Sequence, residues 1–160
     1  MKAIGVLELI SIARGFEAAD DMTKTAEVNL LMAKPICPGK FLIVVEGEVA
    51  AVRSSLASGR EKAGSFIVDE LLLPNVHPEV IPAIYGVTEV GSPQALGLIE
   101  TFSVAAAIQA ADAGLKTAEV ALLELRLALG MGGKSFVVFS GTVSSAQAAV
   151  EAGSALVTQG

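Results

Sequence analysis

Two short apolar runs stand at equivalent places in the two halves of the chain. Residues 3–10 and 95–102 are apolar almost throughout and are flanked by turn residues, which predicts buried β-strands. Each run is followed by an alanine-rich segment, 12–25 or 104–117, in which apolar residues recur at helical spacing. The pattern therefore predicts a strand followed by a helix, twice.

Capping and turn residues place the boundaries of further elements. Ser11 and Ser103 are positioned to cap the two helices, because a serine hydroxyl accepts hydrogen bonds from the N–H groups of a first turn. The rest of the first half predicts strands at 28–33, 41–45 and 66–73, a turn at Gly47, a helix at 49–57 and a short helix that opens at Pro78. This order, βαββαβ with a short terminal helix, predicts an α/β (α+β) fold with helices on one face of a mostly antiparallel sheet.

The two halves are copies of one domain. Segments 3–31 and 95–123 carry the same residue at 15 of 29 positions at a shift of 92, where chance gives roughly two or three. Further along the shift is 94, so that Gly39 aligns with Gly133. Two residues were therefore gained or lost in the intervening loop, which holds the single cysteine of the chain.

The second copy is shorter than the first. We place the domains at residues 1–90 and 91–160. At the shift of 94, Gly160 corresponds to Phe66, so the sequence lacks a counterpart of residues 66–85. Because an unpaired edge beside a core strand is costly, either the natural chain continues with a last strand and a terminal helix, which we favour, or the second sheet is completed in another way.

Composition and charge exclude several classes of protein. An apolar share of 52% excludes disorder, and the charge-free stretch 135–150 contains too many hydroxyl side chains for a transmembrane helix. Glu8 comes too early for a signal peptide, so we expect a cytoplasmic protein. A net charge of −6 and the absence of Trp disfavour nucleic acid as a partner. The apolar share instead predicts association with other copies.

No group of residues in the sequence supports catalysis. His77 is the single histidine and has no cysteine, serine or carboxylate motif beside it, so we interpret it as a structural or interface residue. Glu8 and Glu100 are equivalent positions of the duplicated strand, which favours polar groups facing an interface over an acid–base pair. Residues 130–134 lack the spacing of a phosphate-binding loop. We therefore expect no enzymatic activity.

Cys37 lies in the loop Lys34-Pro-Ile-Cys-Pro-Gly-Lys40, which its prolines make rigid. One thiol per chain can neither close an internal disulfide nor supply the four thiolates of a usual iron–sulfur cluster. If three chains met with this loop on a threefold axis, three thiolates would converge, enough for one [4Fe–4S] cluster. An inert cysteine is the alternative that the residues alone leave open.

Several motifs resemble those of a known family. Ala-Ile-Gly-Val-Leu-Glu before a helix, Lys-Thr-Ala-Glu-Val after it, and a Gly-Lys strand ending in Gly-Glu-Val-Ala-Ala-Val are similar to the bacterial microcompartment shell domain. Because the domain is present twice, the chain resembles the tandem-domain trimeric shell proteins over nearly its whole length. The Pro-Ile-Cys-Pro-Gly-Lys loop resembles that of the T type from propanediol-utilisation compartments.

The resemblance implies a pseudohexameric trimer in which two fused domains replace two subunits of a hexamer. Such discs tile into the wall of a protein organelle. The edge lysine of the family matches Lys24 and Lys116, whose stems would be buried against a neighbouring disc; solvated helix-end lysines are the alternative. The edge Arg-Pro-His motif of the family appears as Asn75-Val76-His77, without the arginine.

The resemblance also implies a cofactor and partners. In T-type shell proteins the loop cysteine lies at the central pore and binds a [4Fe–4S] cluster, and Cys37 matches it, followed by Pro38 and Gly39. The implied function is a shell subunit with one cluster per trimer, bound by three symmetry-related Cys37 residues, for electron transfer or cluster delivery across the shell. The implied partners are other copies of the chain, other shell proteins and an encapsulated redox enzyme.

Two alternatives to this function remain open. The chain is either a tandem shell tile without a cluster, in which Cys37 lines a metabolite pore, or a trimeric sensor that binds a small molecule between subunits. A thiol-redox enzyme is disfavoured because the chain has no resolving cysteine.

Overall fold

The chain folds as two compact units that divide between Val76 and His77 in a computed structural model, which describes residues 2–157. This division comes earlier in the chain than the domain boundary placed at residue 90. The reason is that helix α3 (Val80–Ile84) packs against β6 and α4 of the second unit. The terminal helix assigned to the first copy is thus part of the second compact unit.

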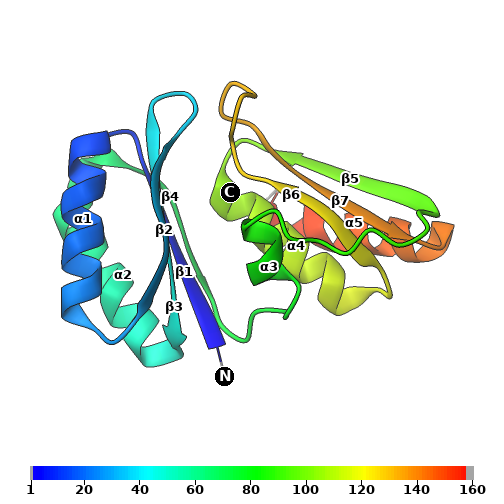
Figure 1. The fold of residues 1–160 in the computed structure, drawn as a ribbon, viewed down its shortest axis with the longest axis horizontal. Helices are drawn as coiled ribbons and strands as arrows, with labels where there is room; N and C mark the ends of the chain where they lie inside the picture. The colour runs from blue at the N-terminus through cyan, green and yellow to red at the C-terminus, as the bar shows by residue number, and fades with distance from the viewer. Residues whose placement is uncertain (1, 158–160) are drawn as a thin grey trace. The chain divides into compact units, whose positions relative to one another are not determined.

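The first unit is a four-stranded antiparallel sheet with two helices on one face (Figure 1). Its elements are β1 (Lys2–Leu9), α1 (Ile12–Thr25), β2 (Asn29–Ile36), β3 (Lys40–Glu48), α2 (Val49–Ala63), a short 3-10 helix (Gly64–Phe66) and β4 (Ile67–Leu73). The strand order is β2-β3-β1-β4. The core between sheet and helices contains fully buried Leu7, Phe41, Ile43 and Val52.

The second unit repeats this design with three strands. After α3 its elements are β5 (Ala95–Thr101), α4 (Val104–Thr117), β6 (Ala121–Arg126), β7 (Ser135–Gly141) and α5 (Val143–Val157). The strand order β5-β7-β6 matches β1-β3-β2 of the first unit. Within residues 2–157 nothing corresponds to β4, so β5 is an edge strand where β1 is a central one.

Strand pairing confirms the duplication at the level of single residues. Gly5 pairs with Val45 in the first sheet, and Gly97 pairs with Phe139 in the second. These pairs are related by the shifts of 92 and 94 found in the sequence. Both sheets also carry an irregularity at the same place in the outer strand, between Leu30 and Met32 or between Leu122 and Glu124.

Most of the elements predicted from the sequence are confirmed, with changes at their ends. The hydroxyls of Ser11 and Ser103 accept the backbone N–H groups of Arg14 and Ala106 as N-caps. The turn expected at Gly47 is wrong, because β3 continues through this glycine to Glu48 and runs directly into α2. Helix α2 extends six residues beyond its expected end, and the short helix starts two residues after Pro78.

The helices of the described segment are short relative to the thickness of a lipid bilayer. Among residues 2–157, none is both long enough and apolar enough to cross a membrane. The two longest, α2 and α5, have 15 residues each, fewer than the roughly 20 that the hydrocarbon core of a bilayer requires.

Candidate functional site

The loop that contains Cys37 forms the tip of the hairpin between β2 and β3. Ile36 and Lys40 are the last paired residues, which leaves Cys37, Pro38 and Gly39 as the loop itself. Gly39 has φ 78°, a conformation that a side chain disfavours, and the Cys37–Pro38 peptide bond is cis. The Cys37 thiol is free and half-buried. The hairpin therefore presents one thiol at its end.

A buried ion pair lies at the base of this hairpin. The Lys40 ammonium contacts the Glu8 carboxylate of the central strand β1. The Glu8 side chain is fully buried and that of Lys40 is only 10% exposed. Buried charges are stable only when they are paired, so the pair fixes the start of β3 to β1 directly behind the cysteine loop.

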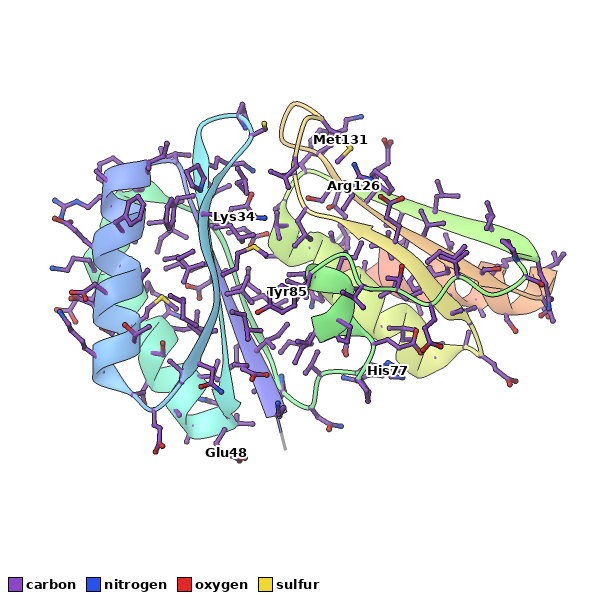
Figure 2. The ribbon with its side chains drawn as sticks, in the orientation of Figure 1. Lys34, Glu48, His77, Tyr85, Arg126 and Met131 are labelled. Atoms are coloured by element: carbon purple, nitrogen blue, oxygen red, sulfur yellow. The ribbon has the colours of Figure 1, made fainter. Side chains whose placement is uncertain are left out.

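The equivalent loop of the second unit is longer and has no thiol. It joins β6 to β7 and carries Met131 (Figure 2), which stands at the shift of 94 from Cys37. Ala128, Gly130 and Gly132 all have positive φ angles between 51° and 75°. The two loops differ in chemistry, because a thioether is a weak ligand that carries no charge.

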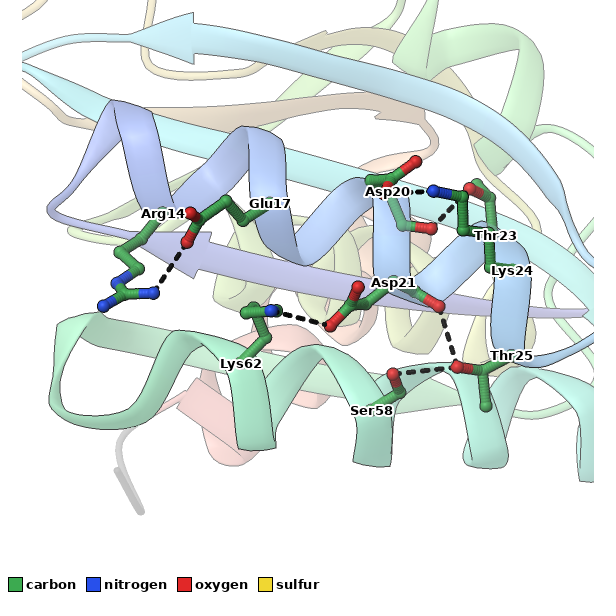
Figure 3. Close-up of polar contacts among 9 residues, drawn as sticks. All are labelled: Arg14, Glu17, Asp20, Asp21, Thr23, Lys24, Thr25, Ser58 and Lys62. Carbon is green, nitrogen blue, oxygen red and sulfur yellow. Dashed lines mark hydrogen bonds and ion pairs between the residues drawn. The ribbon is translucent and has the colours of Figure 1, made fainter.

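The first predicted edge lysine, Lys24, is held by an exposed neighbour on its own helix (Figure 3). Its Nζ lies 2.6 Å from Oδ2 of Asp20, and 70% of the Lys24 side chain is exposed. The hydrogen bond to Asp20, followed by the charge of that carboxylate, raises the pKa of the Lys24 ammonium above its ordinary value. Lys24 is therefore a charged group directed into solvent from the end of α1 in the single chain.

The second edge lysine, Lys116, is held in a different way. Its Nζ lies 2.6 Å from Oδ2 of Asp112, and the Asp112 side chain is only 5% exposed. The other oxygen of Asp112 accepts the backbone N–H of His77 at 2.8 Å. One buried carboxylate thus joins Lys116 to the segment that leads into α3. Of the four predicted edge residues, His77 and Lys116 are brought together by the structure.

Asn75, the other residue of the predicted edge motif, lies in the first unit. It is exposed in the turn after β4 and has φ 53°, a conformation in which asparagine is more common than most residues. The next residue, Val76, donates its N–H to the carbonyl of Lys2 at 3.2 Å. Asn75 and His77 therefore belong to different compact units, although they are only two residues apart.

Two features of the site were missed at the level of sequence. Asp112 was not singled out, although the spacing of Asp20 to Lys24 recurs in Asp112 and Lys116 and indicates a helical ion pair in each copy. The buried contact of Glu8 was also missed. Both copies have a glutamate in the first strand and a lysine directly after the loop glycine. This repetition was the indication in the sequence that the two side chains are paired.

One chain offers few side chains that could together bind a metal ion. Residues 2–157 contain no group of three or more His, Cys, Asp or Glu side chains placed to hold a metal ion. Cys37, as the single cysteine of the sequence, can supply only one of the thiolates that hold an iron–sulfur cluster.

Comparison with known proteins gives consistent matches over both units. A family model described as the BMC domain matches residues 3–76 and again residues 95–160. The bacterial microcompartment shell protein PduT of Citrobacter freundii is 51% identical over 149 residues, which cover 93% of this chain and 81% of that protein.

Solved structures show the same likeness. A microcompartment protein from Desulfitobacterium hafniense is similar with a TM-score of 0.90 and 50% identity, covering 99% of this chain and 88% of that chain. A fused, permuted hexameric shell protein from the RMM microcompartment has a TM-score of 0.78 at 20% identity, over 99% of this chain and 86% of that chain. The second likeness concerns the fold alone.

Proposed function

The chain belongs to the BMC domain family and is a structural subunit of a bacterial microcompartment shell, and we propose that three copies form one pseudohexagonal tile of that shell. The observation that carries this proposal is the duplication: each chain holds two domains with the same strand order and register. Three such chains supply six similar domains to a closed ring. The family role is structural, so no turnover is assigned to the tile.

The finer part of the proposal concerns the centre of the ring. There the β2–β3 hairpins of three chains meet, and the three Cys37 thiolates hold one [4Fe–4S] cluster. The hairpin supports this because its tip carries a free, half-buried thiol. The sequence has one cysteine, and residues 2–157 of one chain contain no group of three or more metal-ligating side chains, so the thiolates of the proposed cluster come from several chains. When bound, such a cluster supplies one-electron transfer, which gives the tile its proposed role in passing electrons or clusters across the shell.

The chain's own residues keep the thiol in place. Gly39 allows the hairpin to turn with a positive φ, and the Lys40–Glu8 pair anchors the first residue of β3. A half-buried thiol on an anchored loop loses little freedom when it binds a metal. The partners that follow from this role are other shell proteins at the tile edges and a redox enzyme inside the compartment.

A second candidate is a tile without a cluster, in which Cys37 lines an open metabolite pore. The observation that favours it is that Cys37 is the one thiol of the sequence and belongs to no group of three or more potential metal ligands within residues 2–157. Both candidates place the same loop at the same pore and differ only in whether iron is bound there.

Iron and sulfide analysis separates the two candidates. The protein is purified without oxygen, and iron, acid-labile sulfide and the visible spectrum are measured beside the variants Cys37→Ala and Met131→Ala. We expect about four irons per trimer and broad absorption that are lost in Cys37→Ala and retained in Met131→Ala, the matched control in the equivalent loop. Iron-free wild-type protein after anaerobic reconstitution would refute the cluster and leave the open pore.

Tile formation is tested separately. Electron microscopy of concentrated protein is expected to show hexagonal discs or sheets, and Lys24→Ala is expected to reduce sheets while the trimer remains. Lys62→Ala is the control, because Lys62 also pairs with an aspartate of α1, Asp21, at 3.3 Å and is not among the predicted edge residues. A wild-type chain that is monomeric at all concentrations would contradict the tile.

A further inference from the structure

The segment of residues 77–94, which leads into the second sheet, is called the strap (Figure 1). It contains α3, which packs against β6, and it ends where β5 begins. Gly86 follows α3 with φ 74°, a conformation that a side chain disfavours, and the chain then continues to Thr88 beside β6. The strap and β6 both belong to the second compact unit.

The strand beside the strap, β6, is an edge of its sheet. The strand order β5-β7-β6 gives β6 one neighbouring strand, which is β7. The sequence of β6 and the residue before it, Val120-Ala-Leu-Leu-Glu-Leu-Arg126, is largely apolar. An apolar edge strand with open backbone N–H and C=O groups is a template on which a strand of another chain can pair. Such an edge has to be covered if the chain is to avoid this pairing.

Two side chains of the strap bind backbone groups of this edge. The Oε2 atom of Glu79 accepts the backbone N–H of Leu122 at 3.2 Å. The hydroxyl of Thr88 donates to the carbonyl oxygen of Leu123 at 2.7 Å. One donor and one acceptor of β6 are therefore bonded as a neighbouring strand would bond them, but by side chains.

An irregularity in β6 explains why both of these backbone groups face the strap. In a regular strand the backbone groups of successive residues point to opposite edges. The register of β6 against β7 shifts between Leu122 and Glu124, which makes Leu123 an extra residue. Such bulges are common at sheet edges, where they interrupt pairing. The side chains of Glu79 and Thr88 thus bind β6 at its bulge.

A groove of about 660 Å³ lies between the strap and the start of β6. It is lined by Pro82 and Val87 of the strap and by Ala121 and Leu122 of the β6 strand. Glu79 and Thr88 line the same groove, and their hydrogen bonds cross from the strap to the strand. Because close packing does not fill this space, the cover over the bulge depends on these two hydrogen bonds.

We propose that the strap is an edge guard: Glu79 and Thr88 occupy backbone groups of β6 and thereby prevent an extended strand of another chain from adding to the second sheet. Backbone groups that are already bonded offer an incoming strand no net gain in hydrogen bonds. The inference goes beyond the proposed ring and does not depend on it, because the strap and β6 lie in one compact unit of one chain.

The test removes both hydrogen bonds in the double variant Glu79→Ala with Thr88→Val, in which valine has a shape similar to threonine. Sedimentation compares the average mass of the assemblies that the variant and the wild-type chain form at equal concentrations. We expect the mass to be about twofold higher or more in the variant, because free β6 edges join assemblies in pairs.

Hydrogen exchange of the Leu122 amide identifies the surface that pairs. In dilute double variant this amide has lost its bond to Glu79, so we expect it to exchange faster than in the wild-type chain. On concentration a strand of another chain replaces Glu79, and exchange of the Leu122 amide is expected to slow again. The exchange rate in the wild-type chain is expected to be the same at both concentrations.

Two control variants separate hydrogen bonding from charge. Glu79→Gln with Thr88→Ser retains an acceptor oxygen and a hydroxyl, so both the mass and the Leu122 exchange are expected to match the wild-type chain. Glu89→Ala removes a carboxylate from the same groove and leaves both bonds in place, with the same expectation. Circular dichroism checks the fold of each variant. If the double variant does not fold, Thr88→Val alone is measured, and its mass is expected to exceed that of the wild-type chain.

The edge guard is overturned by either of two results. The first is a folded double variant, or a folded Thr88→Val variant in its place, that has the mass of the wild-type chain, because the freed edge then attracts no strand. The second is equal association of the conservative variant Glu79→Gln with Thr88→Ser, because the hydrogen bonds are then not the cause. A wild-type chain that never forms trimers refutes the proposed ring, while a higher mass of the double variant still supports the guard.

Discussion

The two units share one strand order and one register, yet equivalent core positions hold different side chains. In the first unit Phe41 fills the space beside Gly15, where a Cβ would lie only 2.3 Å from the ring. The equivalent residues of the second unit are Ala107 and Ser135. There the buried ring belongs instead to Phe139, and Gly114 provides the space for it. The backbone pairing was retained after duplication while each core was refilled around a different aromatic side chain.

The variant with the largest expected effect on stability exchanges one residue between the copies. Phe41→Ser gives the first unit the residue of the second, and we expect it to lower the free energy of unfolding of that unit by about 3–5 kcal/mol, since a buried ring is lost and a cavity remains. Hydrogen exchange of the β3 amides measures the first unit, and that of the β7 amides reports the second, which is expected to be unchanged.

The second step adds Gly15→Ala to Phe41→Ser, which reproduces the Ala107–Ser135 combination. Alone, Gly15→Ala forces a methyl group against the Phe41 ring and is expected to destabilise the first unit. With the ring removed, the methyl group partly fills the cavity, so the double variant is more stable than the sum of the single effects. Strict additivity would show that the two positions do not share one packing site.

The duplication also determines how much the sequence alone can predict. Strands, helices and both serine caps follow from local patterns, and the shifts of 92 and 94 predict the register that Gly5 and Gly97 confirm. The contact between His77 and Asp112 could not be predicted, because it joins residues 35 positions apart through a backbone N–H. No periodicity of side chains carries information on such a bond.

Burial of the repeated glutamate is another feature that a local pattern cannot supply. Glu8 and Glu100 stand in similar sequences, and the structure buries the first and exposes the second. The difference therefore does not follow from the residues of the strand itself. Sequence alone therefore assigned one role to both residues, as polar groups facing an interface, and missed the buried contact of Glu8 with Lys40.

Glu8→Gln tests the contrast between the two glutamates. The variant leaves the buried Lys40 ammonium without a counter-charge, and we expect a loss of about 3 kcal/mol in the free energy of unfolding. Glu100→Gln changes an exposed pair and is expected to cost less than about 1 kcal/mol in the unassembled chain. The free energies of unfolding are compared by chemical denaturation of both variants at the same low protein concentration.

A double variant shows whether charge is the cause. Glu8→Leu with Lys40→Met replaces the pair by apolar side chains and is expected to recover most of the stability lost in Glu8→Gln. If the double variant loses as much free energy of unfolding as Glu8→Gln, the shape of the side chains and not the unpaired charge determines the cost.

The two edge lysines provide a smaller contrast. Lys116→Met removes the partner of the buried Asp112 and leaves that carboxylate with the N–H of His77, so we expect a loss of about 1–2 kcal/mol from the second unit. Lys24→Met leaves Asp20 in water and is expected to leave the unfolding curve unchanged. Identical unfolding curves for both variants would contradict the conclusion that Lys116 is bound to a buried carboxylate while Lys24 is bound to an exposed one.

The smallest effect is a gain in stability in the second unit. The hydroxyl of Ser135, which replaces the Phe41 ring, is buried and has no hydrogen-bond partner among the described residues. Ser135→Ala removes this unsatisfied group, so we expect the second unit to be stabilised by about 1 kcal/mol. Ser140→Ala on the same strand is the control: its buried hydroxyl accepts the N–H of Gln94 at 2.9 Å, and its loss is expected to destabilise. Hydrogen exchange of the β7 amides should therefore slow in the first variant and accelerate in the second, and equal acceleration in both would show that Ser135 is satisfied in solution.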